Sequence, residues 1–369
     1  MPSGPRGGSA IDAAIDERTA VGFVAICRAD DPLGRYLTGR DLGVDVVYVR
    51  VAGETHLRVP STVDVPEVPN ASVRVDDRPA GQAAAAILAD HAPDGTVLAP
   101  RTIPHDTALH LESAGYELSS TTAVRDARAI KDTEEIDAIE GVQRAAKRGI
   151  TAAAVILADA HVEDETLVWG DAPLSTERIR RQVNATLAVE GVDSVGATTV
   201  TTGTRGGRDA AVELVPGEPI VVSVSPRGPA GYRGALARTF VVDADGGWER
   251  RAHVACDAAR DVSLVEANAG ADAGFVGSEI RAETAAFGFS MNDEVTRDVG
   301  GGIGLAAREA PQLDGDTELV EGNVVRVRAA ISHADNGRVE LTDVLVVGED
   351  GPRMLGDAPT GLDPSRWSE

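Results

Sequence analysis

The sequence predicts a mixed α/β (α+β) protein with two domains. The chain has 369 residues, more than one hydrophobic core usually serves, and its hydrophobic content of 43% is ample for packed cores. Short apolar runs alternate with helical patterns over residues 21–122, and a long amphipathic helical pattern begins near residue 132. We therefore expect a small N-terminal α/β domain followed by a larger domain of helices and strands.

The first domain is expected over residues 19–123. The apolar runs "VGFVAICR", "VDVVYVRV" and "GTVLAP" predict strands, and "GQAAAAILADHA" and "HDTALHLESAGY" predict helices. The preceding residues 1–18 are small, polar and rich in glycine and proline. That composition is typical of a disordered tail.

The second domain, expected over residues 124–352, opens with a long helix. Asp132 lies three residues before Glu135, as in a capping box, and apolar residues then recur at spacings of three and four. Further helices are predicted at "LSTERIRRQVNATLAVEGVD" and over about 250–288, and strands at "EPIVVSVSPRG", "GNVVRVRAAI" and "RVELTDVLVV". The stretch "GALARTFVVDADGGWERR" predicts a hairpin turning at Asp245-Gly246, and residues 353–369 are expected to form a C-terminal tail.

The charge of the chain excludes several partners. A net charge of −24 and a pI of about 4.6 predict repulsion from nucleic-acid backbones and anionic membranes. Only Lys131 and Lys147 are lysines, a bias that indicates a halophilic protein whose carboxylates are screened by salt. Cys27 and Cys256 lack the spacing of a disulfide framework or zinc site, and no apolar run resembles a membrane span or signal peptide. We expect a cytoplasmic protein with reduced thiols.

A glycine-rich stretch, "DVGGGIGLAAREAP" from Asp298 to Pro311, contains a GxGxxA match. A dinucleotide-binding loop needs a strand before the glycines and a long helix after them. Pro311 leaves almost no room for that helix, so the match does not predict a nucleotide site.

Several segments, read in order, resemble the pita-bread metallopeptidases (creatinase/aminopeptidase fold), which include Xaa-Pro aminopeptidases and prolidase. The segments are "GRYLTGRD", "RDARAIKDTEEIDAI", "SPRGPAGYRGALARTF" and "GGGIGLAAREAP", and the resemblance runs from about Val21 to Asp350. It implies a creatinase-like N-terminal domain and a second domain with a curved, largely antiparallel sheet flanked by helices. It also implies a homodimer.

The resemblance implies a lost metal site. Members of this family hold two metal ions with two aspartates, one histidine and two glutamates. The corresponding positions here are Ser223, Ala235, Gly301, Arg328 and Glu340, with Asp343 as an alternative for the last. Auxiliary histidines of the family are replaced by Ala210, Arg297 and Arg308. Because one carboxylate cannot hold a catalytic metal, we expect no metal and no cofactor.

The replacements suggest two interpretations of the former metal pocket. In the first, Arg328 pairs with Glu340 and plugs the pocket. In the second, arginines converge on a cavity and bind an anionic ligand such as a carboxylate, a phosphate or an acidic peptide end. The candidate ligand-binding residues are Arg238, Arg297, Arg308, Arg328 and Glu309, and Arg208 and Arg233 could approach the same cavity.

Two functions therefore remain open at this stage. The first is a non-catalytic homologue that binds a protein, a peptide or a small anionic ligand, or acts as a scaffold; the same fold serves a histone-chaperone subunit and a proliferation-associated regulator without peptidase activity. The alternative is an Xaa-Pro aminopeptidase-like metallopeptidase, or another hydrolase, with a rearranged site. The site, and not the fold, decides between them.

Overall fold

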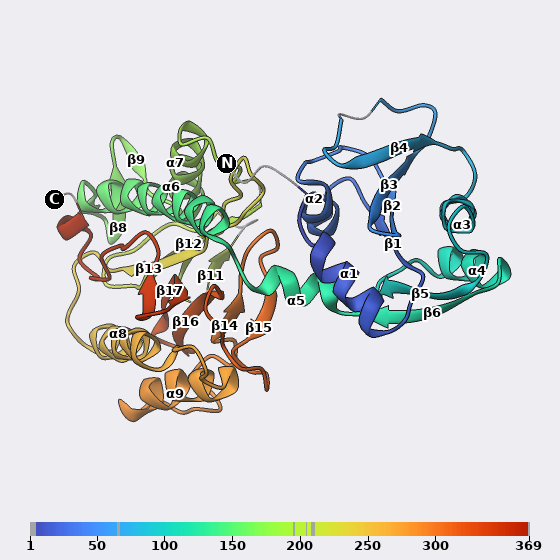
Figure 1. The fold of residues 1–369 in the computed structure, drawn as a ribbon. Helices are drawn as coiled ribbons and strands as arrows, with labels where there is room; N and C mark the ends of the chain where they lie inside the picture. The colour runs from blue at the N-terminus through green and yellow to red at the C-terminus, as the bar shows by residue number, and fades with distance from the viewer. Residues whose placement is uncertain (1–4, 65–66, 195, 204, 208–210, 368–369) are drawn as a thin grey trace. The chain divides into compact units, whose positions relative to one another are not determined.

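A computed structural model describes residues 5–64, 67–194, 196–203, 205–207 and 211–367. The chain divides into two compact units, a first unit over Met1–Arg128 and a second unit over Ala129–Glu369 (Figure 1). The division falls slightly beyond the predicted boundary at residues 123 and 124, after most of helix α5 (Ala123–Ala129).

The first unit is built on a mixed six-stranded sheet in the order β4-β3-β2-β1-β5-β6. Its strands are β1 (Gly22–Cys27), β2 (Val46–Val51), β3 (Glu54–Val59), β4 (Ala71–Val75), β5 (Gly95–Pro100) and β6 (Tyr116–Thr121). Its further helices are α2 (Pro32–Thr38), α3 (Ala80–Ala89) and α4 (His105–Ser113). The valines of β2 pack with buried alanine and leucine side chains of α3, as the apolar runs predict.

The N-terminal segment corrects one prediction. Residues 8–17 form helix α1 (Gly8–Glu17), so the expectation of a disordered tail over residues 1–18 is wrong for this part. Ile11 is buried, and Asp12 forms an ion pair with Arg50 of β2. The helix is thus stabilised by long-range contacts, which a composition rich in small residues does not reveal.

The second unit contains a nine-stranded sheet whose strand pairs are antiparallel, in the order β11-β10-β12-β13-β17-β16-β14-β15, with β18 beside β17. The strands are β10 (Thr198–Thr202), β11 (Arg205–Gly207), β12 (Ile220–Val224), β13 (Leu236–Phe240), β14 (Gly300–Gly302), β15 (Glu309–Gln312), β16 (Val324–His333), β17 (Gly337–Gly348) and β18 (Gly351–Met354). A small separate sheet holds β7 (His161–Glu163), β8 (Thr166–Trp169) and β9 (Ala172–Pro173).

Four helices cover one face of the large sheet. Helix α6 (Thr133–Ala158) packs on β12 and β13, and α7 (Thr176–Val189) packs on β10. Helix α8 (Trp248–Glu266) packs on β16 and β17, and α9 (Ala273–Ala286) packs on β16 (Figure 1). We name this the outer face and its opposite the inner face. Side chains alternate along a strand, so every second residue of β12, β13, β16 and β17 belongs to the inner face.

Local signals fix most of these elements. The capping box predicted at Asp132 and Glu135 opens α6, and Ser175 caps α7. The hairpin predicted at Asp245-Gly246 is wrong: after β13 the chain enters α8 at Trp248, and β13 pairs instead with β12 and β17. The glycine stretch forms β14, and the described residues after it lead into β15, where a dinucleotide-binding loop would need a helix.

The C-terminal segment is part of the second unit. Its 3-10 helix (Pro364–Trp367) places the Trp367 ring against Phe240, with ring centroids 5.3 Å apart, and Val241 N–H donates to the Leu362 carbonyl at 3.0 Å. Residues 353–367 therefore complete the packing of β13 and do not form a separate tail.

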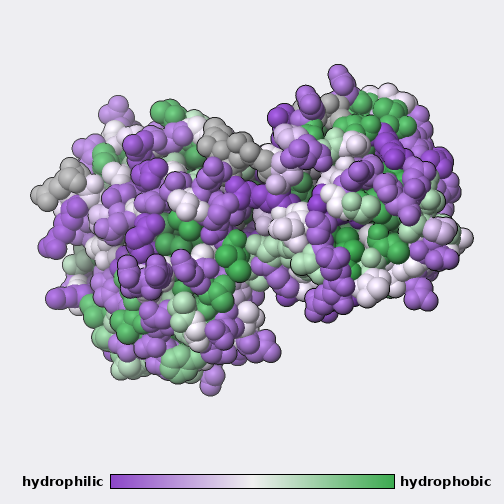
Figure 2. Space-filling view, viewed as in Figure 1, coloured by the Kyte–Doolittle hydropathy of each residue, from purple (hydrophilic) through white to green (hydrophobic). Residues whose placement is uncertain are grey.

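The surface matches the charged composition. Hydrophilic residues cover most of the visible face of each unit in Figure 2. Among the described residues, no helix is both long and apolar enough to cross a membrane. Cys27 and Cys256 are free and buried.

Candidate functional site

The strand register brings the predicted ligand positions of β12, β13, β16 and β17 onto the inner face. Ser223 pairs with Ala237, Ala237 pairs with Thr342, and Thr342 pairs with Arg328. Cross-strand partners point to the same side of a sheet. Ala235, Glu340 and Arg326 each lie two residues from a member of this row, and Gly301 pairs with Arg326. Glu340, and not Asp343, therefore shares a face with Arg328.

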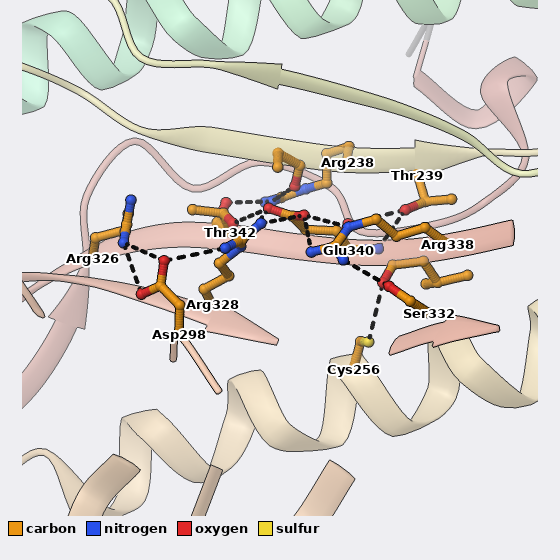
Figure 3. A network of polar contacts seen from close by, with 12 residues as sticks. Arg238, Thr239, Cys256, Asp298, Arg326, Arg328, Ser332, Arg338, Glu340 and Thr342 are labelled. Atoms are coloured by element: carbon orange, nitrogen blue, oxygen red, sulfur yellow. Dashed lines mark hydrogen bonds and ion pairs between the residues drawn. The ribbon is translucent and has the colours of Figure 1, made fainter. Parts of the chain in front are cut away.

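Glu340 is at the centre of a polar network on this face (Figure 3). Its side chain is almost fully buried, and Arg328 donates to both carboxylate oxygens, at 2.8 Å to Oε1 and 2.9 Å to Oε2. Arg338 donates twice to Oε2, at 2.9 and 2.7 Å, and the Thr342 hydroxyl donates to Oε1 at 3.1 Å. The guanidinium group of Arg328 thus binds both oxygens of Glu340, the atoms through which this carboxylate would bind a metal ion.

Asp298, just before β14, extends the network. Arg328 Nη1 donates to its Oδ2 at 3.2 Å, and Arg326 Nη2 lies 3.2 Å from Oδ1. Arg308 Nη2 forms an ion pair with Oδ2 at 2.9 Å. Four guanidinium groups therefore surround two carboxylates, and the cluster formed by Asp298, Arg308, Arg326, Arg328, Arg338 and Glu340 has an excess of positive charge. We name it the arginine cluster.

The arginines hold both acids ionised. Burial opposes the ionisation of Glu340, but the hydrogen bonds and charge of Arg328 and the contribution of Arg338 outweigh it and lower the pKa from 4.5 to about 2. Burial likewise opposes the ionisation of Asp298, and the charges of Arg326, Arg308 and Arg328 lower its pKa.

Two of the replaced positions, Ala235 and Gly301, offer no side-chain oxygen or nitrogen to a metal ion. Ala235 presents a methyl group, while its backbone N–H and carbonyl bond to the Gln143 side chain of α6 at 2.7 and 3.1 Å. At Gly301, an added Cβ would lie 2.9 Å from Cδ and Nε2 of Gln312. The Gln312 side chain thus fills the space beside Gly301, and a histidine there would require it to move.

Arg238, predicted as a ligand-binding residue, lies on the outer face, so that prediction is wrong. Its side chain is 0% exposed, and it forms an ion pair with Asp343 at 2.7 Å. Nε and the two terminal nitrogens also donate to the carbonyls of Ala237, Thr342, Ala358 and Pro359. Arg260 of α8 reaches the second oxygen of Asp343 at 2.9 Å.

The remaining candidates separate into different environments. Glu309 is buried and pairs with Lys131 at 3.1 Å, so it fixes the segment after β14 and does not face a ligand. Arg297 is exposed, and none of the described contacts joins its side chain to the arginine cluster. Arg233 is half-buried, and its backbone N–H donates to Gly304. Ala210 and Arg208 lie outside the described residues.

Sequence reasoning missed Arg326, Arg338 and Asp298. The signal for the first two was the strand period, because Arg326 precedes Arg328 by two residues and Arg338 precedes Glu340 by two. Asp298 lies in an irregular segment, and its approach to β16 depends on the pairing of β14 with β16.

The architecture defines the class: a smaller α/β unit precedes a curved antiparallel sheet flanked by helices, which is the pita-bread arrangement. Residues 137–349, more than half of the chain, match the profile of metallopeptidase family M24. The chain therefore belongs to metallopeptidase family M24 and is related to the prolidases and Xaa-Pro aminopeptidases.

Solved structures show the same fold over nearly the whole chain. The prolidase from Pyrococcus horikoshii is 17% identical with a TM-score of 0.81, covering 96% of this chain and 99% of its own. The Xaa-Pro dipeptidase from Bacillus anthracis is 16% identical with a TM-score of 0.82, covering 96% and 98%. The N-terminal domain of FACT complex subunit SPT16 from Cicer arietinum (chickpea) is 15% identical with a TM-score of 0.76, covering 97% of each chain. No curated protein matches the sequence.

Proposed function

We propose that this chain is a non-catalytic member of its family, and that its arginine cluster binds a negatively charged group of a peptide, a partner protein or a small ligand. The observation that carries the proposal is the bidentate bonding of Arg328 to Glu340 at 2.8 and 2.9 Å. Arg328 stands at one of the five positions where the family resemblance expects a metal ligand. Its guanidinium group binds Glu340, the one carboxylate that remains among the five.

The available donors argue against a catalytic metal at this sheet. Asp298 and Glu340 each bond to at least two guanidinium groups, so a metal ion would have to displace them against their positive charge. Within the described part of the second unit, no three carboxylate, imidazole or thiol side chains lie close enough to share one ion. Without a metal ion the site has no activated water to attack a peptide bond.

The excess positive charge supports anion binding. Arg308 is 62% exposed, and the side chains of Arg326, Arg328 and Arg338 are partly exposed. Arg326 is the least satisfied of the four, because its buried Nε has no hydrogen-bond partner and burial lowers its pKa. On an acidic protein, such a cluster concentrates positive potential where an anion can approach.

The proposal is tested by two assays on the same preparation. Hydrolysis of Xaa-Pro dipeptides with added manganese, cobalt or zinc should not exceed the rate in buffer alone. Titration with an acidic peptide should show binding that a neutral peptide of the same length does not show. Metal-dependent hydrolysis would overturn the proposal and favour a metallopeptidase with a rearranged site.

A matched pair of variants locates the binding site. Arg326→Gln should weaken acidic-peptide binding by about tenfold or more, the loss typical of one hydrogen bond to a charged group. Arg297→Gln removes the same charge from an exposed residue beside Asp298 and should change the affinity much less. Equal losses in the two variants would indicate a general charge effect and contradict a specific site.

A further inference from the structure

The first unit contains a separate group of potential metal ligands: Glu54, His56 and His91. Each offers one donor atom, and these atoms all lie within 4.8 Å of one another. Glu54 and His56 are two residues apart on β3, so their side chains point to the same side of the strand. His91 follows the C-terminal end of α3, and its ring centroid lies 5.4 Å from that of His56.

His56 is an unusual histidine because it is buried without hydrogen bonds. It is 3% exposed, between Val49 of β2 and Ser72 of β4 in the sheet register. Neither Nδ1 nor Nε2 has a hydrogen-bond partner among the described residues. A neutral imidazole carries one donor and one acceptor, and leaving both unsatisfied in the interior costs free energy.

The spacing between Glu54 and His56 suits an ion better than a direct bond. Glu54 Oε2 lies 3.6 Å from His56 Nε2, too far for a hydrogen bond. Two ligands that bind one tetrahedral zinc ion at about 2.1 Å each are themselves about 3.4 Å apart. We propose that Glu54, His56 and His91 form a binding site for a divalent cation of borderline softness, zinc above all, with a fourth position open to water.

The surrounding charges are compatible with a cation. The C-terminal end of α3 carries the negative end of the helix dipole, and Asp90 lies beside His91. Arg74 of β4 is the opposing charge, but it is paired with Asp90 at 2.6 Å. Burial is the main cause that lowers the pKa of His56, with the charge of Arg74 adding to it.

The proposed ion has a structural consequence within the first unit. It would join β3 to the end of α3, two elements that are separated in the chain by the edge strand β4. Glu54 and His91 are exposed, so an ion and its water ligand can reach the site from solvent. The site draws on none of the residues of the arginine cluster, and it does not rest on the proposed function.

The test measures zinc binding to the full chain after removal of any affinity tag and treatment with a chelator that is then exchanged out. Calorimetric titration with zinc should give one ion per chain, and cobalt should give the visible absorption of a tetrahedral site. His91→Ala and Glu54→Gln each remove an exposed ligand and should weaken zinc binding by at least about tenfold. His105→Ala, which removes an exposed histidine of α4 in the same unit, should leave it unchanged.

Thermal unfolding supplies a readout that a merely structural role of these side chains would not give. Without zinc, the two ligand variants should melt close to the unsubstituted chain. With zinc at 100 times Kd, only the unsubstituted chain and His105→Ala should melt higher, by roughly 5 °C or more. Absence of zinc binding, or equal affinity in His91→Ala, overturns the assignment. The His91→Ala chain also lets metal at the arginine cluster be measured separately, so the two proposals fail independently.

Discussion

Two carboxylates on β17 lie three residues apart and on opposite faces of the sheet, and each is held by arginines. Asp343 on the outer face is bound by Arg238 and Arg260, and Arg238 is fully buried with every guanidinium nitrogen bonded. Glu340 on the inner face is bound by Arg328 and Arg338, which stay partly exposed. Similar ion pairs therefore have different roles: every guanidinium nitrogen of Arg238 is bonded inside the protein, which is typical of an ion pair that stabilises the fold.

The inner set is not closed in this way. Arg326 retains an unpartnered Nε, Arg308 is mostly exposed, and the guanidinium groups outnumber the carboxylates they contact. A count of donors, acceptors and exposure thus distinguishes a structural ion pair from a candidate binding surface. Residue type alone does not, because both sets consist of arginine and acidic residues.

The largest effect is expected at the outer face. Arg238→Ala leaves Asp343 buried with one partner and several carbonyls unsatisfied, and should destabilise the chain by about 3–5 kcal/mol. Urea unfolding measures the loss. Arg297→Ala, the control at an exposed arginine, should stay within about 0.5 kcal/mol of the unsubstituted chain. Equal losses of unfolding free energy in the two variants would show that the ion pair of Arg238 and Asp343 does not stabilise the fold.

A smaller, pH-dependent effect is expected for Glu340→Gln. Because folding lowers the Glu340 pKa from 4.5 to about 2, its stabilisation is complete above pH 4.5 and is lost as the pH falls towards 2. The shift corresponds to a stabilisation on the order of 3 kcal/mol at neutral pH. Urea unfolding of both chains at several pH values should show the difference shrinking below pH 4.5. A difference that is constant with pH would contradict the assigned pairing.

The smallest effect on stability is expected for Arg308→Ala. Its ion pair with Asp298 involves a side chain that is mostly exposed, so its loss should cost less than about 1 kcal/mol. The same substitution should still weaken acidic-peptide binding, since it removes a charge from the arginine cluster. Urea unfolding and peptide titration on one preparation separate these outcomes. A large loss of stability with unchanged peptide binding would show that Arg308 has a structural role, as Arg238 does, and does not bind the peptide.

Much of the fold was predictable from local patterns. The capping box at Asp132, the helical spacing after it and the apolar strands of the sheet carry their own signals. The pairing of Arg328 with Glu340 was also predicted, because a cation at an expected carboxylate position needs a counter-charge. The strand period could further have shown that Arg238, one residue after Ala237, faces away from Ser223.

Other features depend on contacts that no local pattern contains. The helix at residues 8–17 is stabilised by the ion pair between its Asp12 and Arg50 of β2. Asp298 enters the arginine cluster because β14 pairs with β16, and the cluster of Glu54, His56 and His91 forms because α3 ends above β3. Such placements require the tertiary structure, since the residues involved are distant in the chain.

The buried pair of Lys131 and Glu309 makes the chain unusually simple to label. The sequence has two lysines; Lys131 is almost fully enclosed, and Lys147 is partly exposed beside the Asp357 carbonyl. Of these two lysines, an amine-reactive reagent applied to the folded chain will therefore modify Lys147, and will reach Lys131 only when the segment carrying Glu309 opens. The acylation rate of Lys131 therefore measures how often the loop beside the arginine cluster opens.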